Sequence, residues 1–351
     1  MKVLYLTKYP RNAASSRLRS YQYFPYLEKN GFKVTVSPLF NEKYITQLYA
    51  KEPISKINLI SCYYRRFMVL LTIKKFDKIV IEKELFPYFF SWFESVLYYL
   101  NVKYVVDYDD AIFHNYDLKS NRLFLFFLKN KIYNVMKYSG TVIAGNAYLA
   151  QKANESGAKN IVNIPTVIDI NNYIVKKKES KKLIVGWIGS PSTFKYVEAI
   201  LPVITTLLSK FDIEFHIIGS KNELPYQSNI KYHDWTEQTE VELIANFDIG
   251  IMPLDNSPWE LGKCSYKLIQ YMGCGVAVVA SPIGMNNELV TEGENGFLAD
   301  THQDWIDKLS LLIENENLRN TMGKNGRQRV AAHYCVQNSF STLISVLKNG
   351  Q

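Results

Sequence analysis

Short apolar runs rich in β-branched residues alternate with longer helical stretches along the chain, and the alternation starts afresh in the middle. This pattern is typical of parallel sheets built from strand–helix–strand units. Strands are expected near 2–7, 33–39, 78–82, 103–107, 140–144 and 161–165, then near 183–188, 213–218, 230–233, 248–252, 276–280 and 296–299. The sequence therefore predicts an α/β protein with two doubly wound, Rossmann-like domains.

The connections between these strands read as helices, and the chain ends in a helical tail. Helices are expected near 16–29, 57–75, 88–100, 119–138, 147–156, 195–210, 238–246, 264–272 and 302–316, with two or three more in 316–349. A chain of 351 residues can form two cores. The expected division is an N-terminal domain 1–170, a lysine-rich linker 171–182, a C-terminal domain 183–335, and a last helix 336–351 that packs back on the N-terminal domain.

Composition and charge narrow the classes of partner. With 47% hydrophobic and 21% charged residues, the chain has the composition of a folded protein. Its net charge of +8 indicates an anionic partner, which could be a phosphate ligand, an acidic membrane surface or nucleic acid. Nucleic acid is disfavoured because basic and aromatic residues interleave only in 119–138.

The cysteines and the first residues indicate a reducing compartment. The spacing of the four cysteines suits neither a metal site nor a set of disulfides, so free thiols are expected. The opening "MKVLYLTKYP" reads as a first core strand and not as a secretion signal. The expected location is the cytoplasm, with the inner face of the membrane as a place for peripheral attachment.

Two segments raise the question of a membrane surface. The apolar window 85–100 is too short to span a bilayer and is expected to form a buried helix, the alternative being a membrane-facing aromatic surface. On a helical wheel of 119–138, four basic residues fall within about 80°, namely Lys119, Arg122, Lys129 and Lys137. Such a helix could rest on an anionic bilayer, although a basic outer face over an ordinary core explains it almost as well.

The loop "GWIGSPSTFKY" at 186–196 suits phosphate binding. A strand ends at Gly189, where a ligand can approach the backbone, and Ser190, Ser192 and Thr193 follow with hydroxyl groups at the start of a helix. An ordinary strand-to-helix turn would have the same residues, so the loop alone decides nothing.

A second candidate ligand site is "DNSPWELGKCSYKLIQYMGCG" at 255–275. Gly262 precedes an expected helix, and Lys263 and Lys267, four residues apart, would share one helix face and neutralise a diphosphate. Gln270 continues that face with a group suited to a sugar hydroxyl. The alternative is a solvated basic helix start.

Taken together, these stretches resemble the GT-B glycosyltransferases, specifically the large retaining glycosyltransferase family 4. The stretches are "GWIGSPST", "NIPTVID", "GKCSYKLIQYMGCGVAVVASPIGMNNELVTEGENGFLA" and "LRNTMGKNGRQRV". The resemblance implies two Rossmann-like domains facing a central cleft, with C-terminal helices. It further implies that a nucleotide sugar binds the C-terminal domain, that a saccharide or lipid-linked saccharide binds the N-terminal one, and that neither cofactor nor metal is needed. Bacterial surface polysaccharide or lipopolysaccharide synthesis is the implied setting.

The sequence departs from the family at two motifs. The family usually carries two glutamates with seven residues between them, the second of which contacts the nucleotide ribose. Here Gln270 stands at the second position and Gly262 at the first. A glutamine side chain both donates and accepts hydrogen bonds. This motif therefore does not fix the geometry with which the nucleotide binds. The family's usual arginine and lysine are absent from "GSPST", and Lys263 and Lys267 are therefore expected to be the phosphate cations.

Three further residues are expected near the donor. Asn286 and Asn287 in "GMNNE" stand at a helix start and would help to fix the donor. Trp235 follows a strand and either borders the base pocket or belongs to the core.

In the first half, "KYVVDYDDAIFH" at 103–114 is the stretch that most strongly indicates a functional site. Asp110 and His114 are expected to be catalytic or acceptor-binding without a metal. Asp107 and Asp109 also match the Asp-any-Asp pattern with which GT-A glycosyltransferases hold a metal-bound nucleotide sugar. A third interpretation is a helix N-cap aspartate with a surface histidine.

The first strand is followed by "TKYPRNAASSRLRSYQYF", which carries two arginines at a helix start. Arg17 and Arg19 are expected to meet a phosphate of the donor or of a lipid-linked acceptor. An arginine gains nothing from the dipole at a helix N-terminus, which mildly favours a ligand. Solvation at the surface is nearly as good an explanation.

Two other functions fit the same residues. A sugar-nucleotide epimerase on the same fold would need no acceptor surface. A non-catalytic membrane-surface binding protein would need no donor site.

Overall fold

The structure is a computed structural model that describes residues 1–50, 52–175, 182–220, 224 and 228–349. The described chain divides into two compact units. Unit 1 comprises Met1–Thr166, Gly262–Cys264 and Ser339–Gln351, and unit 2 comprises Val167–Leu261 and Ser265–Asn338. Half of the predicted linker, 176–181, lies outside the described residues, and its start belongs to a 3-10 turn at Ile170–Asn172.

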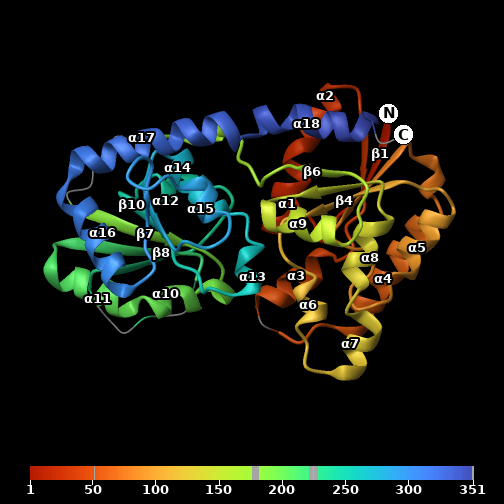
Figure 1. Ribbon diagram of the computed structural model, residues 1–351, viewed down its shortest axis with the longest axis horizontal. Helices are drawn as coiled ribbons and strands as arrows, with labels where there is room; N and C mark the ends of the chain where they lie inside the picture. The colour runs from red at the N-terminus through yellow and green to blue at the C-terminus, as the bar shows by residue number, and fades with distance from the viewer. Residues whose placement is uncertain (51, 176–181, 221–223, 225–227, 350–351) are drawn as a thin grey trace. The chain divides into compact units, whose positions relative to one another are not determined.

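Unit 1 is built on a parallel sheet of six strands in the order β2-β1-β3-β4-β5-β6 (Figure 1). The strands are β1 Lys2–Leu6, β2 Lys33–Val36, β3 Lys78–Glu82, β4 Tyr104–Tyr108, β5 Thr141–Ala144 and β6 Ile161–Asn163. Every residue of β3, β4 and β5 is buried, as a parallel sheet covered on both faces requires. The strand order reverses between β1 and β3, and ligands of such sheets bind at the carboxyl ends beside this reversal.

The helices of unit 1 connect its strands. They are α1 Ala14–Arg19, α2 Phe24–Lys29, α3 Glu42–Tyr49, α4 Lys56–Leu70, α5 Trp92–Tyr99, α6 His114–Asp117, α7 Arg122–Leu128, α8 Lys131–Tyr138 and α9 Ala147–Glu155. Most of α18, Val336–Asn349, also belongs to unit 1, where Tyr23 Oη lies 2.9 Å from Ser339 Oγ.

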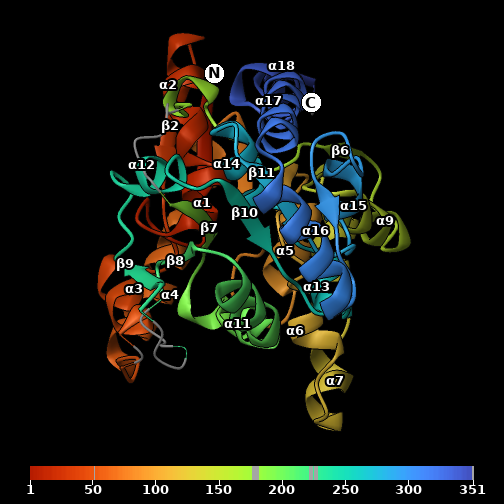
Figure 2. The same cartoon turned by 90° about the vertical axis from the view of Figure 1, so that its left-hand side faces the viewer.

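Unit 2 repeats the architecture with the order β12-β11-β10-β7-β8-β9, and Figure 2 shows β10, β7, β8 and β9 following one another. Its strands are β7 Leu183–Ile188, β8 Ile213–Ile218, β9 Ile230–His233, β10 Ile249–Met252, β11 Ala277–Ala280 and β12 Phe297–Leu298. Its helices are α10 Lys195–Ala199, α11 Leu201–Lys210, α12 Glu240–Ile244, α13 Pro258–Leu261, α14 Tyr266–Gly273, α15 Asn286–Leu289, α16 His302–Glu314 and α17 Glu316–His333. The order reverses between β7 and β10.

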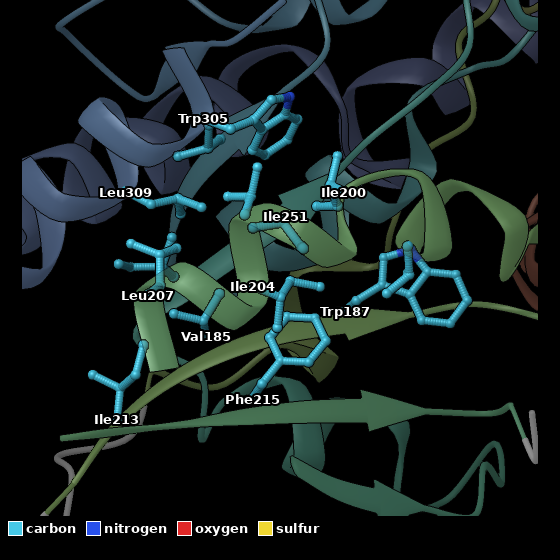
Figure 3. Packing of buried hydrophobic residues seen from close by; sticks show 14 of the residues in the cluster. Val185, Trp187, Ile200, Ile204, Leu207, Ile213, Phe215, Ile251, Trp305 and Leu309 are labelled. Carbon is cyan, nitrogen blue, oxygen red and sulfur yellow. The ribbon is translucent and has the colours of Figure 1, made fainter. Parts of the chain in front are cut away.

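One face of the unit 2 sheet packs on α11 and α16 through a continuous core (Figure 3). Trp187 and Phe215 come from the strands, Leu207 from α11, and Trp305 and Leu309 from α16, all buried. This core fixes the ends of β7 and β8, from which the candidate ligand loops leave.

Two helix predictions were wrong in detail. The expected helix 119–138 breaks into α7 and α8 around Lys129 and Asn130, so the predicted arc of four basic residues does not exist. Lys131 at the start of α8 is buried and forms an ion pair with Glu84. The expected buried helix 88–100 shortens to α5, and of the residues in α5 only Glu94 and Leu97 are buried.

The four cysteines are buried and have free thiols, as predicted. Among the described residues, no helix combines the length and apolar character needed to cross a membrane.

Candidate functional site

Unit 1 gathers charged side chains at the carboxyl ends of β1, β3 and β4. Glu82, the last residue of β3, is buried and accepts hydrogen bonds from Ser16 Oγ at 2.9 Å and from the backbone N–H of Lys8 at 3.2 Å. The next residue, Lys83, has a φ of 68°, an uncommon conformation for a residue with a side chain. This strained turn carries the Lys83 side chain back into the cluster.

Lys83 and Asp109 form the central ion pair of the cluster. Lys83 Nζ lies 2.8 Å from Asp109 Oδ1, and Ser15 Oγ donates to Asp109 Oδ2 at 2.7 Å. Although burial acts in the opposite direction, the Lys83 ammonium lowers the pKa of Asp109 to about 2. Asp109 is therefore ionised at neutral pH and committed to partners within the protein.

Asp110, by contrast, keeps its carboxylate available. It is half-buried, and within the described part of the chain its side chain makes no hydrogen bond or ion pair. Burial and the neighbouring Asp109 raise the pKa of Asp110, because two adjacent carboxylates resist sharing negative charge. A half-buried carboxylate without a protein partner can accept a hydrogen bond from a bound hydroxyl.

Arg19, which is predicted to contact a phosphate, is paired with Asp107 in this structure, so a phosphate would have to compete with that carboxylate. Its Nε and Nη2 donate to the two carboxylate oxygens at 2.9 and 2.5 Å, and its Nη1 donates to the carbonyl oxygen of Ile164 at 2.9 Å. Both partners of this bidentate pair are buried. Arg17 is buried as well, on the same short helix α1, so neither arginine is solvated at the surface.

These pairs also weaken the metal-binding interpretation of the Asp-any-Asp pattern. Asp107 faces the Arg19 guanidinium and Asp109 faces the Lys83 ammonium. A divalent metal would have to displace a buried cation from each carboxylate.

The structure places His114 in a network that leaves its ring no free nitrogen. Nδ1 lies 2.8 Å from Asp117 Oδ1, and Nε2 lies 2.8 Å from Tyr148 Oη. Tyr133 Oη donates to the other oxygen of Asp117 at 3.0 Å. This arrangement indicates that His114 holds α6 in place. His114 is therefore not part of the proposed catalytic set.

In unit 2, the Gly189 loop leaves the carboxyl end of β7 at the strand reversal. A Cβ at Gly189 would lie 2.4 Å from Trp187 Cζ2 and 2.8 Å from Thr193 Oγ1, so only glycine fits. Ser190 Oγ and Ser192 Oγ lie 2.9 Å apart and are exposed or half-buried, next to Thr193. The loop thus presents bare backbone and two hydroxyl groups.

Helix α14 carries Lys267, a cation that lies near this loop. Its Nζ stands 5.8 Å from the centre of the Trp187 ring, the same ring that underlies Gly189. Lys263 does not share a helix face with it, because α14 begins after Ser265, whose φ is 50°. Lys263 groups with unit 1 and Lys267 with unit 2.

Gln270 does not continue a ligand-binding face, contrary to expectation. Its side chain is buried, and its Nε2 donates to Tyr173 Oη at 3.2 Å within unit 2. The helix turns Gln270 into the interior, so a ribose contact would require this bond to break.

Of the two asparagines predicted to fix the donor, Asn286 is fully buried. Its amide accepts from Ser265 Oγ at 2.7 Å and donates to the carbonyl oxygen of Ser281 at 2.9 Å, so it joins two loops. Asn287 is exposed and donates to the carbonyl oxygen of Pro282 at 3.0 Å. We therefore treat Asn286 as a residue that shapes the loops.

Trp235 lies at the edge of the same loops. It is half-buried, and its Nε1 donates to Glu240 Oε2 at 2.6 Å. Gly219, with a φ of 84°, would place a Cβ 2.8 Å from the Gly189 carbonyl oxygen and 3.2 Å from Trp235 Cβ. Gly189, Gly219 and Trp235 thus meet where β7, β8 and β9 end.

The sequence analysis missed several charged residues at these edges. Glu82 and Lys83 follow an apolar strand directly in "KIVIEKE", a signal that was present. In unit 2, Glu260 is buried and accepts from the hydroxyls of Ser257 and Tyr196, which lower its pKa against the effect of burial. Lys195 Nζ lies 3.3 Å from Asp255 Oδ2 beside it.

A separate cavity of about 830 Å³ in unit 2 lies at the opposite edge of the sheet. Asp248 and Val276 line it, and they precede β10 and β11. Since ligands of doubly wound sheets bind at the carboxyl ends, we do not assign the donor to this cavity.

Comparison with known proteins finds similarity in the second half of the chain. Residues 182–315 match the family model described as glycosyl transferases group 1. An uncharacterized glycosyltransferase of Methanocaldococcus jannaschii is 29% identical over 174 residues, covering 46% of this chain and 43% of that protein. The N,N'-diacetylbacillosaminyl-diphospho-undecaprenol alpha-1,3-N-acetylgalactosaminyltransferase of Campylobacter jejuni is 27% identical over 157 residues, covering 42% and 40%. The chain spans less than half the length of these two curated relatives.

Among solved structures, Anabaena Alr3699/HepE in complex with UDP matches with a TM-score of 0.72. The identity is 16%, and the match covers 99% of this chain and 100% of that one. At this identity the likeness concerns the fold alone. The predicted GT-B fold, with two Rossmann-like units, is confirmed.

Proposed function

Since residues 182–315 form a glycosyl transferases group 1 domain in a chain with the GT-B fold, we propose that this protein is a glycosyltransferase. It moves a sugar from a nucleotide-sugar donor to a saccharide or lipid-linked saccharide acceptor, with retention of anomeric configuration, as a member of glycosyltransferase family 4. The setting is the synthesis of a bacterial surface polysaccharide or lipopolysaccharide. The Campylobacter jejuni relative, whose name describes transfer to a diphospho-undecaprenol-linked sugar, supports a lipid-linked acceptor.

The observation that carries the donor assignment is the meeting of Gly189 and Lys267 on Trp187. The glycine lets a diphosphate approach the backbone, and the ammonium stands above the same indole ring. Ser190, Ser192 and Thr193 supply hydroxyl groups beside it. A cation and hydrogen-bond donors around a diphosphate stabilise the negative charge that grows on the leaving nucleotide.

On the acceptor side, Asp110 is the residue that we assign to the reacting hydroxyl. It is ionisable, half-buried and without a protein partner in the described ranges, whereas Asp107 and Asp109 are neutralised by Arg19 and Lys83. The Lys83–Asp109 pair positions Asp110 and has no direct part in the reaction. The protein's contribution is thus positioning, charge stabilisation and acceptance of the hydroxyl proton by Asp110, without a metal ion.

A nucleotide panel tests this function. One nucleoside diphosphate, with UDP tried first, is expected to raise the melting temperature of the protein, since a ligand that binds only the folded state stabilises it. This shift should persist in the presence of a chelator. If no nucleotide shifts the melting temperature, or if chelation abolishes the shift, the donor site assigned here is wrong. If a nucleotide binds as expected, NMR of the transfer product tests whether the anomeric configuration is retained.

Replacement of Lys267 by alanine is expected to weaken UDP binding at least about tenfold, because a charge-assisted bond contributes roughly 1.5–3 kcal/mol. Lys210→Ala is the matched control, since Lys210 also stands over an aromatic ring of unit 2, with Nζ 4.7 Å from the centre of Phe211. Titration calorimetry measures both. If the two variants bound UDP with equal affinity, Lys267 would not belong to the diphosphate site.

A further inference from the structure

Helix α4 of unit 1 carries an apolar stripe that faces solvent. Ile57, Ile60, Tyr64 and Met68 recur every three or four residues, which places them on one side of the helix. All four are exposed, and Ile57 keeps 82% of its accessible surface. A surface helix normally turns such a stripe to the core, so this one is available to a partner.

Two neighbouring helices extend the exposed apolar surface. On α5, Trp92, Val96 and Tyr99 follow the same spacing, and Tyr99 is 78% exposed. On α7, Leu123 and Phe126 are exposed, the latter by 82%.

Aromatic contacts link α4 to α5, and the segment before α5 to α7. The rings of Phe67 on α4 and Phe93 on α5 lie 6.3 Å apart, and those of Phe90 and Phe127, before α5 and on α7, lie 5.7 Å apart. A groove of about 340 Å³ beside α5 and α7 is lined by five polar and four aromatic side chains, the aromatic ones being Phe90, Trp92, Phe126 and Phe127. The stripe on α4 therefore continues across α5 to α7.

The charges within this surface are of one sign. Exposed lysines and arginines occur in 56–75 and in 118–129, namely Lys56, Arg65, Lys74, Lys75, Lys119, Arg122 and Lys129. The segments 56–75, 88–100 and 118–129 contain a single acidic residue, Glu94, which is buried and accepts from the backbone N–H of Leu85 at 2.9 Å. We call these exposed cations, with the exposed apolar residues of α4, α5 and α7, the basic aromatic face.

We propose that the basic aromatic face docks on the surface of an anionic lipid bilayer. Tryptophan and tyrosine favour the level of lipid headgroups, where an apolar ring and a polar tip are both accommodated. Lysines and arginines around them are attracted to anionic lipids. Interfaces between proteins are instead depleted of lysine relative to the surrounding surface. The mixture of aromatic and exclusively basic side chains thus selects a membrane over a protein partner.

Docking would bring a lipid-linked acceptor to the carboxylate cluster of the same unit. Lys83 pairs with Asp109 at the end of β3, and Tyr88, five residues later and four before α5, is exposed. This consequence rests on the proposed glycosyl transfer, whereas docking itself does not.

Co-sedimentation of the full chain with vesicles tests the proposal. The protein is expected to bind phosphatidylcholine vesicles that contain phosphatidylglycerol, to bind pure phosphatidylcholine vesicles much less, and to dissociate as salt rises. A basic residue near an anionic bilayer contributes about fivefold to partitioning. The triple variant Lys119→Gln/Arg122→Gln/Lys129→Gln should therefore bind roughly 100-fold more weakly.

The matched control removes three exposed lysines from other surfaces of unit 1, in the variant Lys29→Gln/Lys33→Gln/Lys159→Gln. It carries the same net charge as the first triple variant and should bind like the unmodified protein. Equal loss in both would mean that only net charge matters, and would overturn the proposal.

An aromatic variant tests the apolar part of the face. Trp92→Ser/Phe126→Ser should weaken vesicle binding about tenfold or more, because each substitution removes a large apolar ring that the bilayer would bury. Leu311→Ser/Ile174→Ser, which alters two exposed apolar residues of unit 2, should bind normally. If the unmodified protein ignores anionic vesicles, or if it forms a dimer that the aromatic variant splits, the face serves another partner and the proposal fails.

UDP binding by the same variants, measured without vesicles, separates this proposal from the proposed function. Vesicle binding without any nucleotide binding would contradict glycosyl transfer alone. Nucleotide binding without vesicle binding would contradict docking alone.

Discussion

Replacement of Arg19 by methionine is expected to lower the free energy of unfolding by about 3–5 kcal/mol, because it leaves a buried carboxylate without its cation. Arg19 holds both oxygens of Asp107, at 2.9 and 2.5 Å, and both side chains are buried. Urea denaturation at neutral pH measures the change.

The double variant Arg19→Met/Asp107→Leu should recover most of this loss, since the buried charge is then removed along with its partner. Arg122→Met, at an exposed arginine, is the matched control and should change stability by less than about 0.5 kcal/mol. If the single variant loses less than about 1 kcal/mol, or if the double variant is no more stable than the single one, Asp107 does not depend on Arg19 in the way that the structure indicates.

Replacement of Asp110 by asparagine is expected to reduce kcat/KM for the acceptor about 100-fold or more, within the range known for a lost acid–base group. UDP affinity should stay unchanged, because Asp110 belongs to unit 1 and the proposed donor site to unit 2. The variant should fold normally, since it removes one of two adjacent negative charges. Initial rates over a range of acceptor concentrations measure the effect.

The pH profile separates this role from a structural one. Burial and Asp109 raise the pKa of Asp110, and only its ionised form accepts the hydroxyl proton. The rate should therefore fall as the pH falls through that raised pKa, and Asp110→Asn should lose this acid limb. Glu155→Gln, at an exposed glutamate of the same unit, should keep both the rate and the limb. An acid limb that persists in Asp110→Asn would mean that another group titrates.

Most of the strands were predictable because a buried parallel strand leaves a short run of apolar, β-branched residues. The run "KIVIE" is β3, and "LIVGWI" is β7. Helix limits were harder. The structure contains α3, which was not predicted although Asn41 offered an N-cap and accepts from the backbone N–H of Tyr44 at 3.0 Å.

The break between α7 and α8 had no comparable local signal. Lys131 begins a new helix because its ammonium is drawn into the interior by Glu84, a residue that follows β3. The exposure of the aromatic residues on α5 likewise depends on which faces the neighbouring helices cover. Local periodicity cannot report either feature.

In the candidate site, too, local sequence predicted some features and missed others. The sequence placed Gly189, Asp110 and Lys267 near strand ends or helix starts, because polar residues and glycine directly after an apolar strand stand out in the pattern. It singled out Asp110, but it could not show that Asp107 and Asp109 are neutralised by Arg19 and Lys83. It also could not foresee that Gln270 and Asn286 are buried.

The sequence by itself thus determined the two α/β units, their strand order along the chain, and the strand ends that carry the candidate sites, because these follow from patterns within a few residues. Only the tertiary structure decided which charged side chains meet a partner and which stay available. That choice depends on residues far apart in the chain, as with Arg19 and Asp107, and on the burial that makes an unpaired charge costly.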